Sequence, residues 1–278
     1  MNSTRLRHLM SRVARLERRG SGLIDLKGVD LSGRDLKGKN FSKTDLTGAD
    51  LSNADLIGAN LAGANLTGAD LSKANISDAD LTGADLTNAV CPQVNLNRAK
   101  MRQSKLVGAN LSAAKLIEAV LTEADLSLAN LTYVDMSEAV VVQATLSSAN
   151  LTGSDLSRAN FTNSTLTNAT LSETGLVGAT LTSANLAGAN LKDALLSEAD
   201  LGGADLTKAN LSGADLTDAY MRGAKLINAN LTGADLQGAT LTRVVLIGAD
   251  LTGAKYNDQT KLPFTITHAQ LDSMIKTP

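Results

Sequence analysis

The segment that most resembles a chemical motif lies between Gly33 and Asn40 and reads Gly-Arg-Asp-Leu-Lys-Gly-Lys-Asn. Glycines spaced this way before a lysine are typical of a phosphate-binding loop, whose backbone N–H groups cradle a nucleotide. Asn40 stands where that loop has the serine or threonine that binds Mg²⁺, and no long helix is predicted to follow. We interpret the match as a product of glycines that recur every five residues, and we predict no nucleotide site.

Other reactive side chains are too few and too scattered to assemble a site. His8 and His268 lie at opposite ends of the chain, and Cys91, the single cysteine, stands where neighbouring repeats have leucine. The numerous aspartates lack the glycine-rich nonapeptide of calcium-binding β-rolls. Because no nucleophile, base and orienting acid can be combined from this set, we predict no enzyme, no cofactor and no metal site.

A five-residue repeat organises most of the chain. Every fifth position from 26 to 256 is apolar or nearly so, and 38 of these 47 positions are Leu. Two residues before each lies a small residue, and 35 of the 42 such positions from 49 to 254 are Ala. Asp or Asn stands between the two columns in most repeats. The nine exceptions to Leu are Phe41, Ile76, Cys91, Met101, Met136, Val141, Phe161, Met221 and Tyr256.

A period of five fits a short strand followed by a bend, and it fits neither an α-helix nor a long strand. Ala-Asp-Leu alternates inward, outward and inward, as a strand does. Nineteen of the 23 glycines occupy the second of the two residues that follow, where a turn can require positive φ. The pattern therefore predicts a solenoid whose interior is filled by layers of Ala and Leu.

Units such as Ala49–Asn53 (ADLSN) and Ala64–Gly68 (ANLTG) resemble the repeat of the pentapeptide-repeat family, and the resemblance covers residues 24 to 256. It implies an all-β fold, a right-handed four-sided parallel β-helix with four repeats to a coil. This chain would then form about 12 coils, and at ~4.8 Å per coil the rod would be roughly 57 Å long.

Both ends are predicted to carry short capping helices, because a solenoid must cover its end coils. Residues 1–20 form an amphipathic helix with an arginine-rich face, for which binding to a membrane surface or to nucleic acid is the alternative role. Residues 21–256 form the β-helix. Residues 257–278 contain an exit segment and a helix over roughly 268 to 275, which Thr267 begins.

Function must then reside on the outward positions, which can be aligned by stacking residues 20 apart. Three kinds of surface emerge: an acidic row in the first coils, a basic band, and two aliphatic patches. The acidic row is Asp30, Asp50 and Asp70; the basic band is Arg98, Lys100, Arg102, Lys105 and Lys115; the patches are Val120, Val140 and Val142, and Ile227, Val245 and Ile247.

Composition limits the setting. The 278 residues include no Trp, three Phe and three Tyr, and no apolar run approaches the roughly 18 residues that span a bilayer. The N-terminus lacks the apolar stretch of a secretory signal, and one cysteine excludes an internal disulfide. We therefore expect a cytoplasmic bacterial protein, either a monomer or an end-to-end or side-by-side homodimer.

The leading functional hypothesis is a non-enzymatic scaffold that presents its surface to an unidentified protein partner. The resemblance supplies an alternative, since the best-understood members of the family bind DNA gyrase by imitating duplex DNA. Residues 21 to 256 carry 25 acids and 18 bases, a net charge of −7, whereas DNA of the same length carries roughly 33 negative charges. The charge therefore favours the scaffold, and neither direct nucleic-acid binding by the rod nor a small-molecule substrate is expected.

Overall fold

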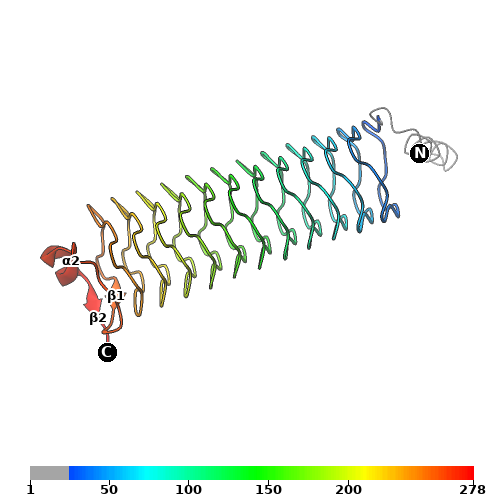
Figure 1. Ribbon diagram of the computed structural model, residues 1–278. Helices are drawn as coiled ribbons and strands as arrows, with labels where there is room; N and C mark the ends of the chain where they lie inside the picture. Colours follow the sequence, from blue (N-terminus) through cyan, green and yellow to red (C-terminus); the bar gives the residue numbers. More distant parts are fainter. Residues whose placement is uncertain (1–24) are drawn as a thin grey trace.

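The computed structural model describes residues 25–278, which form one long rod of stacked coils (Figure 1). Residues 20 apart pair in parallel, beginning with Asp25 and Asp45, and this spacing is the one expected from four five-residue sides. The pairs form four ladders along the rod, which we name by their first residues: the Asp25, Asp30, Asp35 and Asn40 ladders. Each side contributes a single residue to its ladder, so that almost all of the pairing is by isolated bridges.

Each side of a coil is held to its neighbours by a repeated set of main-chain hydrogen bonds. On the Asp30 ladder, the N–H groups of Leu51 and Asn53 donate to the carbonyls of Asp70 and Ser72 in the next coil, at 2.7 and 2.8 Å. The N–H of Asp70 donates back to the carbonyl of Ala49 at 2.9 Å. The backbone polar groups that a stack of short sides would otherwise leave unpaired are thereby satisfied between coils.

The interior consists of the two columns that the sequence pattern places inside. From Leu26 to Leu246, every member of the leucine column is at most 3% exposed, and the same limit holds for the alanine column from Ala49 to Ala239. The larger residues Phe41 and Phe161 occupy leucine positions at 0% exposure. Burying one leucine contributes on the order of 1.5–3 kcal/mol before entropy is subtracted, so the stability of the rod comes from this repeated layer.

The corners explain where glycine stands. Every residue at the second turn position, from 28 to 253, has φ between 54° and 73°, and the 27 residues other than glycine in this column share that conformation. None of those 27 is Val, Ile or Thr, the β-branched types for which positive φ is most costly. The sequence prediction of a turn with positive φ is confirmed, and glycine proves to be preferred there but not required.

The C-terminal segment leaves the repeat and returns to the last coil. Thr240 pairs with Lys261, 21 residues further on, so the exit contains one extra residue. Strand β1 (Lys255–Tyr256) pairs in parallel with β2 (Ile275–Lys276), and α2 (His268–Ser273) lies between them in the chain at the end of the rod (Figure 1).

The helix predicted over 268 to 275 is shorter than expected. Thr267 begins it as predicted, since its hydroxyl accepts the N–H of Gln270 and the Gln270 side chain accepts the N–H of Thr267. It ends at Ser273 because the N–H of Ile275 donates to the carbonyl of Ala254, which draws the chain into β2. Ile275 is consequently 51% exposed and does not belong to the apolar face of a helix.

The predicted N-terminal helix, within residues 1–20, lies outside the described residues. In the first coil, the alanine column holds Val29, Arg34 and Lys39; Val29 is half-buried and the other two are exposed. No helix within residues 25–278 has the length and apolar character that crossing a membrane requires.

Candidate interaction surfaces

The outward Asp and Asn side chains hold the turns. At most of these positions Oδ1 accepts the backbone N–H of the residue two further on, as Asp70 does from Ser72 at 2.9 Å and Asn130 from Thr132 at 3.2 Å. A following serine or threonine hydroxyl often donates to the same oxygen. Because the bond uses only Oδ1, either Asp or Asn can accept it. The sequence reasoning treated these residues only as surface and missed this structural role.

The hydrogen bonds also influence ionisation. The hydroxyl and the N–H of Thr47 lower the pKa of Asp45, and those of Thr252 lower the pKa of Asp250, because both groups favour the charged carboxylate. The same cause, with Ser32 as the donor, lowers the pKa of Asp30. Asp30, Asp45 and Asp250 are therefore held in the charged form, and each keeps an Oδ2 that the turn does not use.

The acidic row lies on one ladder, as the stacking by 20 requires. Asp50 pairs with both Asp30 and Asp70; Asp30 is exposed, whereas Asp50 and Asp70 are half-buried. Asp55, on the neighbouring Asp35 ladder, forms an ion pair with the turn residue Lys37 at 3.0 Å, which offsets part of the negative charge of these coils.

The basic residues do not share one face. Lys100, Lys105 and Lys115 lie on the Asn40, Asp25 and Asp35 ladders respectively. Arg98 is paired through two nitrogens with Asp78, at 2.7 and 2.8 Å, and Arg102 contacts Glu123 at 2.9 Å. The positive charge is thus divided among sides and partly neutralised, so these residues form no concentrated basic surface.

The first aliphatic patch is present as a contiguous set. Val120 and Val140 pair on the Asn40 ladder, and Val142 follows Val140 in the chain, two residues on. All three are half-buried, because neighbouring coils 20 residues away cover part of each side chain. The patch therefore exposes less apolar surface than three outward valines alone suggest.

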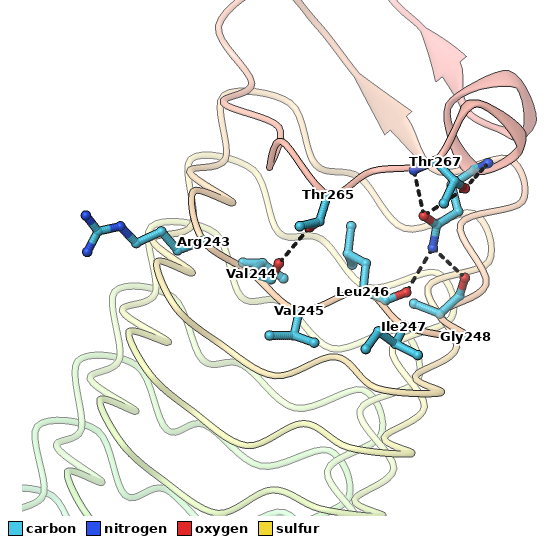
Figure 2. A pocket seen from close by; sticks show the side chains of 10 residues that line it. Arg243, Val244, Val245, Leu246, Ile247, Gly248, Thr265 and Thr267 are labelled. Carbon is cyan, nitrogen blue, oxygen red and sulfur yellow. Dashed lines mark hydrogen bonds between the residues drawn. The ribbon is translucent and has the colours of Figure 1, made fainter.

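The second aliphatic patch lies beside a pocket at the C-terminal end. Ile227 and Ile247 occupy the same corner column one coil apart, and Val245 pairs with Lys225 on the Asp25 ladder. Ile227 and Val245 are half-buried, but Ile247 is 70% exposed. A pocket of about 610 Å³ is lined by residues 243–249 together with Thr265, Thr267 and Gln270, as Figure 2 shows.

Several exposed apolar residues were not identified from the sequence, and two of them lie close together. Leu128 and Tyr133 are 65% and 70% exposed and occupy adjacent corners of one coil. The Tyr133 ring lies against Gly153 of the next coil so closely that a Cβ there would come within 2.7 Å of the ring. The available signal was an aliphatic or aromatic residue in a column otherwise composed of glycine and mostly polar residues.

The residues singled out for chemistry are not brought together. Cys91 is fully buried, and this burial, with the charge of Asp70, raises the pKa of its thiol to about 12. Gly33 and Gly38 are corner residues with φ near 60° like all others in the column. His8 lies outside the described residues, and in the part of the chain that the structure describes no three His, Cys, Asp or Glu side chains are grouped to hold a metal ion.

The chain belongs to the pentapeptide-repeat family. The family model for pentapeptide repeats matches eight times between residues 24 and 255, and successive matches cover nearly all of that range. No protein with a curated description matches the sequence significantly.

Solved structures of other pentapeptide-repeat proteins are similar to this chain. HetL of the cyanobacterium Nostoc sp. strain PCC 7120, a protein involved in the regulation of heterocyst differentiation, is 34% identical; the match covers 87% of this chain and 94% of HetL, with a TM-score of 0.35. A protein of the Arabidopsis thaliana thylakoid lumen is 28% identical over 51% of this chain and 68% of its own, with a TM-score of 0.20. QnrB1, a plasmid-mediated fluoroquinolone resistance protein, is 17% identical over 64% and 86% of the two chains, with a TM-score of 0.30.

Proposed function

We propose that this protein is a non-enzymatic scaffold of the cytoplasm, a right-handed β-helix that a partner protein recognises along the sides of the rod. The observation that carries the proposal is that different positions of each repeat serve the core, the turn and the surface. Leu and Ala fill the interior, and Oδ1 of Asp or Asn holds the turn. The remaining outward atoms are free to vary from coil to coil, which gives an extended surface of the kind through which solenoids bind partners.

Three surfaces are proposed as contacts. The acidic row of Asp30, Asp50 and Asp70 offers three carboxylates on successive coils. The two aliphatic patches offer side chains that a partner would remove from water at roughly 25 cal/mol per Å². Ile247 has the most to contribute among the aliphatic residues, because it is 70% exposed.

The acidic row also supports a second candidate function, in which the rod imitates DNA and binds a DNA-binding enzyme such as gyrase. A rod of roughly 57 Å matches about 17 base pairs in length. Its net charge of −7 over residues 21 to 256 is about a fifth of the charge on such a duplex. Long-range electrostatic attraction to a DNA-binding groove would be correspondingly weak, so the first proposal is preferred.

An affinity purification from bacterial lysate, followed by quantitative mass spectrometry, tests both functions. Wild-type protein is compared with a variant in which Asp30, Asp50 and Asp70 are all changed to Asn. This change removes three charges while Oδ1 continues to accept the turn N–H groups. The control changes Asp200, Asp215 and Asp250 to Asn. It removes the same charge, but from one position on each of the Asn40, Asp35 and Asp30 ladders.

A partner that is retained by wild type and by the control but lost by the acidic-row variant identifies the row as its contact. If that partner is a gyrase subunit, the DNA-mimic function replaces the scaffold as the conclusion. A partner that all three forms retain directs attention to the aliphatic patches, for which Val140→Thr and Ile247→Thr are the next variants. Recovery of no stoichiometric partner under any condition contradicts the scaffold proposal.

A further inference from the structure

The last coil ends in an open main-chain edge on the Asp25 ladder. In the coil below, the N–H groups of Leu226 and Asn228 donate to the carbonyls of Val245 and Ile247, at 2.9 and 2.8 Å. The equivalent N–H groups of the last coil, on Leu246 and Gly248, have no acceptor among residues 25–278.

The edge is open because the chain does not continue the coil there. After Lys261 pairs with Thr240, the chain crosses the end of the rod to α2. The crossing segment contacts this edge only through side chains: the Thr265 hydroxyl donates to the Val244 carbonyl at 3.3 Å. The Gln270 amide donates to the Leu246 carbonyl at 3.0 Å (Figure 2).

The space beside this edge has the size and lining of a peptide groove. The pocket of about 610 Å³ along residues 243–249 adjoins a second one of about 340 Å³, which residues 262–265 line together with Thr242 and Arg243. Ile247 borders the first pocket and Phe264, fully exposed, borders the second. A ligand that spans both pockets would therefore meet an exposed apolar side chain in each.

The charge of the groove selects among peptides. Arg243 is the one ionisable residue that lines either pocket, and its guanidinium makes no ion pair with any residue in the range 25–278. In Figure 2 its side chain extends outward from the start of the edge. A single unpaired cation beside apolar walls is complementary to a ligand that carries one carboxylate.

We propose that this edge binds an extended peptide segment of a partner protein, which adds a strand to the last coil and places a carboxylate near Arg243. Leu246 and Gly248 are two residues apart, so their N–H groups can meet successive main-chain carbonyls on one side of an extended strand. Thr265, Thr267 and Gln270 line the same pocket as the edge residues 243–249, so the edge is one wall of a pocket and not part of a flat surface, which favours a peptide over the flat end of a second rod. The inference rests on the scaffold function and specifies one contact for it.

The test begins with a phage-displayed library of random dodecapeptides, selected on the full chain and counter-selected on the variant Ile247→Asp. Binding of enriched synthetic peptides is then measured for Arg243→Glu and Ile247→Asp. The matched controls are Ile227→Asp, in the same column one coil lower, and Arg222→Glu, an exposed arginine outside the groove. We expect the two groove variants to weaken binding at least tenfold and the controls to change it less than twofold.

Amide hydrogen exchange of the labelled protein supplies the second readout. Bound peptide is expected to slow exchange at Leu246 and Gly248 at least tenfold, and to leave Leu226 and Asn228 unchanged because these are already paired. Peptides synthesised with free and with amidated C-termini distinguish a terminal carboxylate from an acidic side chain as the group near Arg243.

Three results would overturn the inference: no peptide is enriched over the counter-selection, enriched peptides leave both amides unprotected, or the amides become protected without peptide as protein concentration rises. The last result would identify a second copy of the chain as the occupant. A cellular partner that still binds Ile247→Asp would leave the scaffold function standing while contradicting this edge as its contact. Peptide binding at the edge without any cellular partner would have the reverse meaning.

Discussion

Threonine replaces alanine at two positions of the inner column, and the structure predicts that the same substitution has opposite effects at them. Thr44 is 1% exposed and its hydroxyl has no hydrogen-bond partner. Thr174 is 0% exposed and its hydroxyl donates to the carbonyl of Leu151 at 2.9 Å. Changing each to valine keeps the shape of the side chain and removes only the hydroxyl.

The magnitudes follow from what the hydroxyl does at each site. A buried polar group without a partner costs about 1–3 kcal/mol, so Thr44→Val is expected to raise the free energy of unfolding by about 1–2 kcal/mol. Loss of a hydrogen bond whose acceptor keeps another donor costs about 1 kcal/mol. The Leu151 carbonyl also accepts the N–H of Ser154, so Thr174→Val is expected to lower the free energy of unfolding by that amount. The column already holds buried valine, as at Val94, so a second methyl group fits.

The free energy of unfolding would be measured by urea denaturation, together with native-state amide exchange, because a solenoid can open locally before it unfolds globally. Exchange at the amide of Leu46 would report on Thr44→Val, and exchange at Leu176 on Thr174→Val. Val94→Thr serves as the reverse control and is expected to be destabilising by about 1–3 kcal/mol. If Thr44→Val and Thr174→Val shift the stability in the same direction, the hydroxyl reasoning is wrong.

Three further predictions concern the corners, the turns and the core. Gly68→Ala is expected to lower the free energy of unfolding by about 1 kcal/mol through the positive φ alone, because a Cβ at Gly68 would meet nothing within 4 Å. Gly153→Ala is expected to lower it more, because its Cβ would also displace the Tyr133 ring. The midpoints of urea denaturation would compare the two variants. Since the pKa of Asp45 is lowered in the folded state, its contribution to stability is present at neutral pH and is lost below about pH 4. Asp45→Asn should make the melting temperature fall less on acidification. Cys91, buried and with a thiol pKa of about 12, is expected to react with a thiol reagent only after unfolding, which absorbance at neutral pH would follow.

The repeat could be predicted from the sequence because its determinants are local. Each position in the five-residue unit has one environment, so the residue type at that position is repeated dozens of times and reveals the environment. The inward columns and the positive φ at the corners were found in this way. The stacking of Asp30, Asp50 and Asp70, and of Val120 and Val140, followed from the same period.

The C-terminal end could not be predicted to the same depth because it has no repeat. The end of α2 at Ser273 depends on the hydrogen bond from Ile275 to Ala254, a contact between residues 21 positions apart that no local pattern indicates. The groove depends on where residues 262–270 cross the rod, which is a property of tertiary packing. Sequence reasoning named Val245 and Ile247 as exposed aliphatics, but it missed the unpaired N–H groups of Leu246 and Gly248.

The turn hydrogen bond separates the requirements of the fold from those of the surface. Because the Oδ1 of Asn and that of Asp can both accept the turn N–H, the geometry of the turn does not determine which of the two stands at an outward position. Stacked carboxylates about 5 Å apart repel one another, so stability alone would favour Asn throughout a ladder. The Asp30 ladder does carry Asn at 110, 130 and 150, but it carries Asp at 30, 50 and 70. The hydrogen bonds from Ser32 favour the charged form of Asp30, whereas the stacking of three carboxylates on successive coils opposes it. This electrostatic cost is the reason to test the acidic row first as a contact.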